Sequence, residues 1–200
     1  MKAAQSRPSI GLLLSEVFLI VVGVLLGLFG NEMRLEQREQ RRTEMALEQI
    51  SEEIRDNQSQ IDRIHPHHFV VRDSLNALMS RTLPTESPVS LQELWRSMSG
   101  GFGVASLRQN AWKLANSMGA IEHMDYGTAS LLSRLYDLQE FYTDKYSRLS
   151  DNLYLAANVD PGVRQGLIFA LAVLTNDIVI HEEDLKLFYE RVLEHLEAVE

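Results

Sequence analysis

The 200-residue sequence predicts an all-α protein in which a single N-terminal transmembrane helix continues into a long stalk helix and an antiparallel helical bundle. Residues 10–30 form a long, predominantly apolar run. Beyond them, apolar residues recur at three- and four-residue spacing, which is the period of a helix face. Strand-like alternation is limited to residues 178–180. We divide the chain into a short tail (1–9), a transmembrane helix (10–30), a charged stalk helix (31–46) and a bundle domain (47–200).

The first element has the length and polarity of a membrane span. It contains two polar side chains, Ser15 and Glu16, and as a helix it extends about 31 Å, the thickness of a bilayer's hydrocarbon core. The alternative is a cleaved signal peptide, since Lys2 and Arg7 precede the run. However, the run exceeds a signal peptide's apolar region and ends in large residues where a cleavage site needs small ones. We therefore expect a retained anchor.

One side of this helix is suited to pairing, because glycines let two membrane helices approach closely. Such pairing predicts a homo-oligomer or a membrane protein partner, although glycine also occurs in membrane helices without pairing. Glu16, the ionisable member, is interpreted as a partner contact, an acid tolerated near the interface or, least favoured, an ion relay. At 100° per residue, the pairing side consists of Glu16, Ile20, Gly23, Gly27 and Gly30.

The next stretch predicts one long helix, since no proline occurs between the anchor and Pro66. Residues 31–46 carry few apolar side chains and are interpreted as a solvated stalk. After residue 46, apolar residues recur at three- and four-residue spacing, which indicates a packing seam with one polar member. That member, Asn57, either fixes the register of packing or lies at the bundle edge. The bundle seam consists of Leu47, Ile50, Ile54, Asn57, Ile61 and Ile64.

Three histidines occur in His65-Pro66-His67-His68. Imidazole is a common ligand of zinc, copper and nickel. Neighbouring side chains on a helix diverge, however, and no cysteine or His-Glu-x-x-His pattern supplies further ligands. We therefore predict no metal and no other cofactor, and we interpret Pro66 as the first residue of a new helix ending near Arg81.

Two short helices are expected in the middle of the chain. Ser90-Leu91-Gln92-Glu93 is a capping box, and the helix it begins should stop at Gly100-Gly101. The Gly-Gly-Phe-Gly of residues 100–103 lacks the lysine of a phosphate-binding loop and predicts a turn. The second helix is expected over Ser106–Met118, closed by Gly119, with Trp112 as an anchor in the core.

Longer helices complete the predicted bundle. Asp125 should cap a helix that runs to about Ala157, whose tyrosines fit the rim of a bundle better than a ligand surface. Asp160-Pro161-Gly162 is a helix start signal. The apolar run 167–174 is too short to span a membrane and predicts a buried core helix. A last amphipathic helix is expected over 181–200.

Composition excludes several function classes. The net charge is −9, which opposes nucleic-acid binding, and the absence of cysteine excludes disulfides and thiol chemistry. No nucleophile elbow, catalytic triad or metal-ligand spacing is recognisable. We therefore predict no enzyme, no catalytic residues and no small-molecule substrate, and a lipid bilayer as one partner.

The side of the membrane is indicated by the charges that flank the anchor. The arginines after it favour a cytoplasmic domain by the positive-inside rule. Glutamates alternate with these arginines, and the preceding tail is short. We therefore expect the N-terminus on the cytoplasmic side of the membrane and the bundle outside it.

A resemblance supports the anchored architecture. The apolar helix opened by Glu16, followed by Asn31-Glu32 and a charged helix, resembles the start of a group of bacterial membrane-anchored proteins of unknown function. The stretch Ala111-Trp112-Lys113-Leu114, with Gly119 after it, is similar to their later portion, whereas Met33 stands where they often have tryptophan. The resemblance implies a single-pass inner-membrane protein and supplies no activity and no catalytic residues.

These observations predict a membrane-anchored interaction or scaffold protein that self-associates through its membrane helix. The alternative is a sensory protein in which helix shifts in the bundle pass through the stalk to the membrane. An enzyme is the least favoured class.

Overall fold

The computed structural model of the chain describes residues 10–82, 90–98, 101–158 and 160–199. Among these residues every regular element is a helix, so the predicted all-α fold class is confirmed for this part of the chain. The elements in order are α1 (Ile10–Thr82), α2 (Leu91–Ser97), α3 (Asn110–Ser117), the 3₁₀ helix η2 (Ala120–His123), α4 (Tyr126–Asn158) and α5 (Pro161–Val199).

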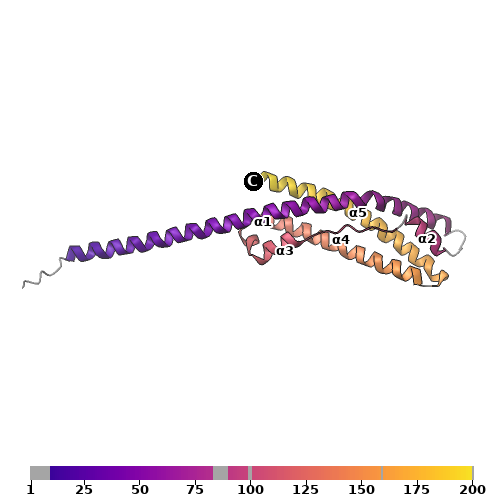
Figure 1. Cartoon of the computed structure of the whole chain (residues 1–200), viewed down its shortest axis with the longest axis horizontal. Coiled ribbons are helices and arrows are strands. Elements are labelled where there is room, and N and C mark those ends of the chain that lie inside the picture. Colours follow the sequence, from indigo (N-terminus) through magenta and orange to yellow (C-terminus); the bar gives the residue numbers. More distant parts are fainter. Residues whose placement is uncertain (1–9, 83–89, 99–100, 159, 200) are drawn as a thin grey trace, which may run out of the picture.

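Helix α1 dominates the shape of the molecule. Its 73 residues extend about 110 Å at 1.5 Å per residue. Figure 1 shows its N-terminal part projecting alone, while its C-terminal part lies alongside the other helices. Packing begins near Thr43, whose hydroxyl donates to the carbonyl of Ala120 at 3.3 Å. Because Thr43 lies within the stretch expected as the stalk (31–46), we restrict the name stalk to residues 31–42 from here on and call the part of the described chain from Thr43 onward the body.

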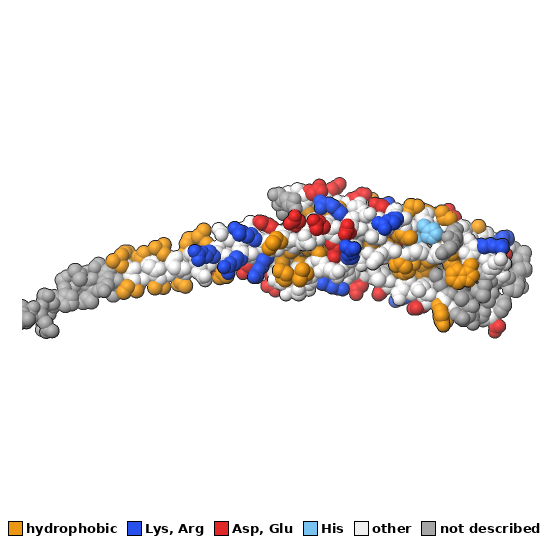
Figure 2. All heavy atoms as spheres, in the orientation of Figure 1, with side chains coloured by type: hydrophobic (Ala, Val, Ile, Leu, Met, Phe, Trp, Pro, Cys, Tyr) orange, Lys and Arg blue, Asp and Glu red, His pale blue; other side chains and the backbone are white. Residues whose placement is uncertain are grey.

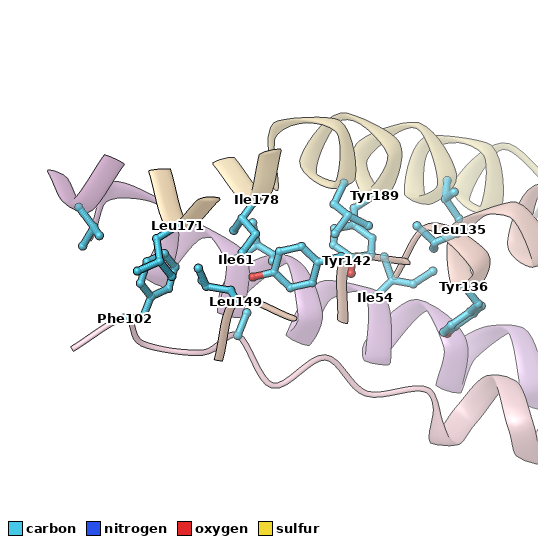
Figure 3. Packing of buried hydrophobic residues seen from close by; sticks show 14 of the residues in the cluster. Ile54, Ile61, Phe102, Leu135, Tyr136, Tyr142, Leu149, Leu171, Ile178 and Tyr189 are labelled. Carbon is cyan, nitrogen blue, oxygen red and sulfur yellow. The ribbon is translucent and has the colours of Figure 1, made fainter. Parts of the chain in front are cut away.

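The body is built from three long helices. Helices α4 and α5 run in opposite directions, and α5 packs along α1. Figure 3 shows side chains from all three helices meeting between the ribbons, with Tyr142 and Tyr189 near the middle. The largest fully buried side chains of this core are Tyr142, Tyr189, Ile50, Ile54, Ile61, Leu75, Met98, Leu132, Leu135, Leu149, Ile168 and Leu171.

The predicted helix boundary at Pro66 is wrong, because α1 runs through this residue without a break. A proline inside a helix removes one backbone hydrogen bond and typically costs about 3 kcal/mol. Burial of residues before and after Pro66 offsets this cost here. His65 and His68 are buried, and Val71 and Leu75 continue the packed face. The proline ring itself lies on the exposed side.

The predicted helix start at Ser106 is also wrong. Residues 101–109 have no regular structure, and α3 begins at Asn110. Phe102 and Ala105 of this segment are buried against the core. The segment therefore obtains its packing energy as an extended strap across the body, and helix propensity over residues 106–109 is overridden.

Several predicted helix ends are confirmed. Ser90 and Glu93 form the capping box of α2, which ends at Ser97, earlier than expected. Gly119 follows α3 with φ of 71°, the left-handed conformation that favours glycine. A side-chain oxygen of Asp125 accepts a hydrogen bond from the Thr128 amide at the start of α4. The segments expected as a core helix and a final helix are parts of the single helix α5.

Candidate functional site

The apolar N-terminal part of α1 is exposed in the isolated chain. Phe18 and Leu26, for example, are 67% and 66% exposed. By length and composition this part of α1 can cross a membrane. Figure 2 shows apolar side chains along this end of the rod, followed by basic side chains on the stalk. So large an apolar surface is unfavourable in water, which makes the stretch a candidate membrane anchor.

The expected pairing face lies on this exposed stretch. Ile20 is 61% exposed. A Cβ atom added to Gly23, Gly27 or Gly30 would meet nothing within 4 Å, so these glycines have no packing role within the described chain. Glu16 belongs to α1, and its side chain lies outside the described residues.

Four polar side chains inside the body form what we call the His–Glu cluster: His65 and His68 of α1, Tyr142 of α4 and Glu182 of α5. Nδ1 of His65 lies 2.8 Å from Oε2 of Glu182. Nδ1 of His68 lies 2.7 Å from Oε1, to which the Tyr142 hydroxyl donates at 2.8 Å. The side chains of His68 and Glu182 are 0% exposed. One buried carboxylate thus joins the three long helices.

The protonation of His68 follows from its two neighbours. Its Nε2 lies 2.7 Å from the carbonyl oxygen of Phe102, and a carbonyl can only accept. With Glu182 ionised, both ring nitrogens donate and the imidazole is positively charged. Burial by itself lowers the pKa of His68, but the hydrogen bond to Glu182, the charge of Glu182 and the Phe102 and Gly103 carbonyls together raise it above its ordinary value.

The tyrosines around the cluster remain donors. Burial and the negative charge of Glu182 raise the pKa of Tyr142, and they raise that of Tyr146 to about 12. The Tyr146 hydroxyl donates to the carbonyl of Gly103. Because solvent does not reach His68 or Glu182, the arrangement acts as a joint between helices. Satisfied buried networks of this kind rigidify a core and specify its packing.

The third histidine points elsewhere. Nε2 of His67 lies 2.8 Å from the carbonyl oxygen of Gly101. His67 and His68 therefore both fasten the strap to α1, on different carbonyls. Among the described residues no group of histidine, aspartate and glutamate side chains has a geometry that could hold a metal ion.

Asn57 occupies a second polar position in the core. Of the predicted seam, Ile50, Ile54, Asn57 and Ile61 are 0% exposed, and Leu47 and Ile64 are partly buried against the core. The Asn57 amide donates to the Arg108 carbonyl at 2.8 Å, and its oxygen accepts from the Arg108 amide at 2.8 Å. The interpretation of Asn57 as a bundle-edge residue is therefore wrong. The Asn57 side chain makes the pair of hydrogen bonds that the backbone of a neighbouring strand would make. It thereby holds the end of the strap.

Glu53 is a further buried polar residue of α1 that holds another element. One oxygen accepts from the Ala111 amide at 2.9 Å and so caps α3, and the other accepts from the Tyr136 hydroxyl at 2.9 Å. Trp112, expected as a core anchor, is partly buried at the edge of the core. Its ring stacks on Tyr136 with a centroid distance of 5.1 Å.

Two grooves flank α1 where the stalk meets the body. One, of about 880 Å³, lies between α1 and the η2–α5 side and is lined by residues that include Glu36, Glu39, His123 and Leu196. The other, of about 440 Å³, lies between α1 and α3, with Met45, Leu114 and Met118 among its residues. Both grooves have charged and apolar side chains in their lining, and Met45 lies between them.

Sequence reasoning did not find Glu182, Tyr142 or Glu53 as partners of these sites. Their contacts join residues 40 to 117 positions apart, and one sequence carries no signal of such pairing. Comparisons with known protein families, with curated proteins and with solved structures find no match to this chain.

Proposed function

We propose that this chain is a membrane-anchored helical interaction protein, in which α1 serves as anchor, stalk and one wall of an antiparallel bundle. The observation that carries the proposal is the continuity of α1, from an exposed apolar end to a fully packed end. A rigid helix that is apolar at one end and packed at the other holds the body at a fixed distance from the lipid. The proposal includes no catalytic step.

Fractionation of the full chain tests the anchor. Val21→Lys with Leu25→Lys places two charges in the apolar stretch, each costing about 3 kcal/mol at a bilayer centre. Gln37→Lys with Gln40→Lys adds the same charge to the stalk and is the control. We expect the control and the parent chain to resist carbonate extraction and the first variant to be released. Release of the parent chain would overturn the anchor.

The interaction role is tested in native membranes. Photo-crosslinking residues placed at exposed positions of the body, such as Ser59 and Leu187, should link the protein to one defined partner. The same residues introduced in the apolar stretch should yield lipid adducts or a partner's membrane helix. Adducts spread over many unrelated proteins would contradict an interaction module.

Pairing through the membrane helix is a separable part of the proposal. Gly23 and Gly27 are exposed and have no packing role within the described chain, and close helix approach across glycines is one of the few gains available in lipid. Gly23→Leu with Gly27→Leu should abolish pairing in a membrane two-hybrid assay. Val21→Leu with Leu25→Val, on the opposite side of the helix, should leave it unchanged.

The side of the membrane is proposed from the sequence alone: a bacterial inner membrane, with the body in the periplasm. The chain has no cysteine, so a single cysteine at exposed Ser59 is a clean reporter. We expect a membrane-impermeant maleimide to label Ser59→Cys in intact cells. Labelling only after lysis would place the body in the cytoplasm.

A sensory protein is the second candidate function, and the same continuity of α1 favours it. A shift of α5 or α4 against α1 would move a helix that has no break before the membrane stretch. A ligand-dependent rise in melting temperature, together with a changed crosslinking pattern in the membrane helix, would select this candidate.

A further inference from the structure

The charges of the stalk are sorted by side of the helix. Arg34, Arg38, Arg41 and Arg42 are exposed and fall within about 100° of one another around the helix axis. We call these four residues the arginine face. Glu32, Glu36 and Glu39 are centred about 140° away from them. Charges that alternate in the sequence are therefore separated in space.

The two sides of the stalk have different surroundings. Glu36 and Glu39 line the groove shared with His123 and Leu196, and Nδ1 of His123 lies 3.7 Å from Oε2 of Glu39. The acidic side thus leads into the body. Within the described part of the chain, none of the four arginines forms an ion pair, and Figure 2 shows basic side chains gathered on the stalk.

The distance between these arginines and the apolar stretch indicates which partner can contact them. Arg34 lies about 6 Å beyond Gly30 along the helix axis, and Arg41 about 17 Å beyond it. The polar layer of each leaflet is about 5–8 Å thick, so an upright helix brings Arg34 to the headgroups. A tilt of α1 toward the arginine face, within the range observed for membrane helices, lowers the others toward the same layer.

We propose that the arginine face binds the phosphates of anionic lipids and that this binding tilts α1 toward that side. The inference rests on the proposed membrane anchoring. Guanidinium groups form paired hydrogen bonds with phosphate oxygens, and basic residues beside a membrane helix are attracted to anionic lipid surfaces. The tilt brings down the α3 side of the body, which adjoins the arginine face at Arg42 and Met45.

A second copy of the chain is a less favourable partner for the arginine face than anionic lipid. In a parallel pair the three- and four-residue spacing of Gly23, Gly27 and Gly30 continues into Arg34, Arg38 and Arg41, so like charges would face each other. Pairing confined to the membrane segment leaves the arginines uncovered. The lipid contact therefore applies to a single copy and to a membrane-confined pair.

The test measures tilt in the full chain inserted in nanodiscs. Because the chain has no cysteine, a fluorophore can be attached at Met118→Cys, on the α3 side, or at Ala198→Cys, near the end of α5 on the other side. Energy transfer to labelled headgroups reports the distance of each. With phosphatidylglycerol in place of phosphatidylcholine, we expect the label at residue 118 to approach the surface and the label at residue 198 to recede.

Charge variants identify the cause. Arg34→Gln, Arg38→Gln, Arg41→Gln and Arg42→Gln together should remove the lipid-dependent shift, as should high salt, which screens exposed charges. Glu32→Gln, Glu36→Gln and Glu39→Gln together are the matched control and should keep the shift. Equal distances in both lipids, or a shift that persists in the arginine variant, would overturn the inference. Carbonate resistance of the same variants is measured in cell membranes, and its loss would instead indicate failure of the anchor.

Discussion

His68 and Glu182 form a buried ion pair in which Nδ1 of the imidazole lies 2.7 Å from Oε1 of the carboxylate. The pair joins α1 to α5 across 114 residues of sequence. With Glu182 ionised, and because the opposite ring nitrogen faces the Phe102 carbonyl, both ring nitrogens of His68 donate hydrogen bonds. The contact between α1 and α5 therefore depends on the protonation of the His68 side chain.

The first prediction concerns pH. The pKa of His68 in the folded protein is raised above its ordinary value of 6.5. A proton bound more tightly in the folded state stabilises that state, fully so below the unfolded pKa and no longer above the folded pKa. We expect the free energy of unfolding to fall as pH rises above 6.5, measured by urea titration of the full chain in detergent.

The control for the pH prediction is His68→Gln, which keeps a hydrogen-bonding side chain without the titration. The titratable groups that contact His68 or its carboxylate are Glu182 from α5, Tyr142 and Tyr146 from α4, and His65 and His67 on α1 itself. The raised pKa of each tyrosine keeps it protonated over this range. The variant should be less stable at low pH and show a smaller pH dependence. If the pH dependence of the variant's stability is unchanged, a group other than His68 causes it.

The second prediction concerns the carboxylate. Glu182→Gln leaves a charged His68 buried without its counter-ion, and breaking a buried pair in this way costs about 3–5 kcal/mol. Glu190→Gln, at an exposed position of the same helix, should change the free energy of unfolding by less than about 0.5 kcal/mol. Tryptophan fluorescence in urea measures both, since Trp112 stacks on Tyr136 of the body and the other tryptophan, Trp95, belongs to α2. Equal stability of the two variants would contradict the ion pair.

The third prediction concerns the strap. Asn57→Ala removes both hydrogen bonds to the Arg108 backbone. Gln139 still donates to the Arg108 carbonyl, so the Arg108 amide is the backbone group left unpaired, at a cost of about 1–3 kcal/mol. We expect faster hydrogen exchange in residues 101–109, with little change in α5. Ser59→Ala, on the exposed side of α1, is the control. Unchanged exchange at Arg108 would mean that the buried Phe102 and Ala105, together with the histidine contacts to Gly101 and Phe102, hold the strap without Asn57.

The parts of this fold that could be predicted depend on short-range physics. The seam around Ile50 and Ile54, the capping box of α2 and the αL position of Gly119 each follow from residues within a few turns of one another. The site lies beyond that range, because Glu182 meets His68 only through tertiary packing. Tertiary packing also overrides local signals at Pro66, where a proline normally ends a helix.

The fourth prediction follows from the unbroken helix at Pro66. Pro66→Ala restores a backbone donor within α1, and the exposed side chain costs no packing. We expect the free energy of unfolding to rise by about 1–3 kcal/mol, with α1 otherwise unchanged by circular dichroism. A decrease in stability would show instead that the proline is needed to bring His65 and His68 onto Glu182.

The fifth prediction concerns Gly103, where the strap passes between α1 and α4. Its φ is +64°, and an added Cβ would overlap the Cδ1 methyl of Ile64. An alanine in the left-handed region costs about 1–2 kcal/mol, and displacement of the methyl adds to this. Gly103→Ala should therefore destabilise the body, while Gly166→Ala, in a helix with open space around it, should stabilise it by about 0.5–1 kcal/mol.

Gly103→Asn separates the two causes, because asparagine tolerates the left-handed conformation but still carries a Cβ. If the asparagine variant is as stable as the parent chain, backbone strain is the main cause of the destabilisation. If it matches the alanine variant, contact with Ile64 is the main cause.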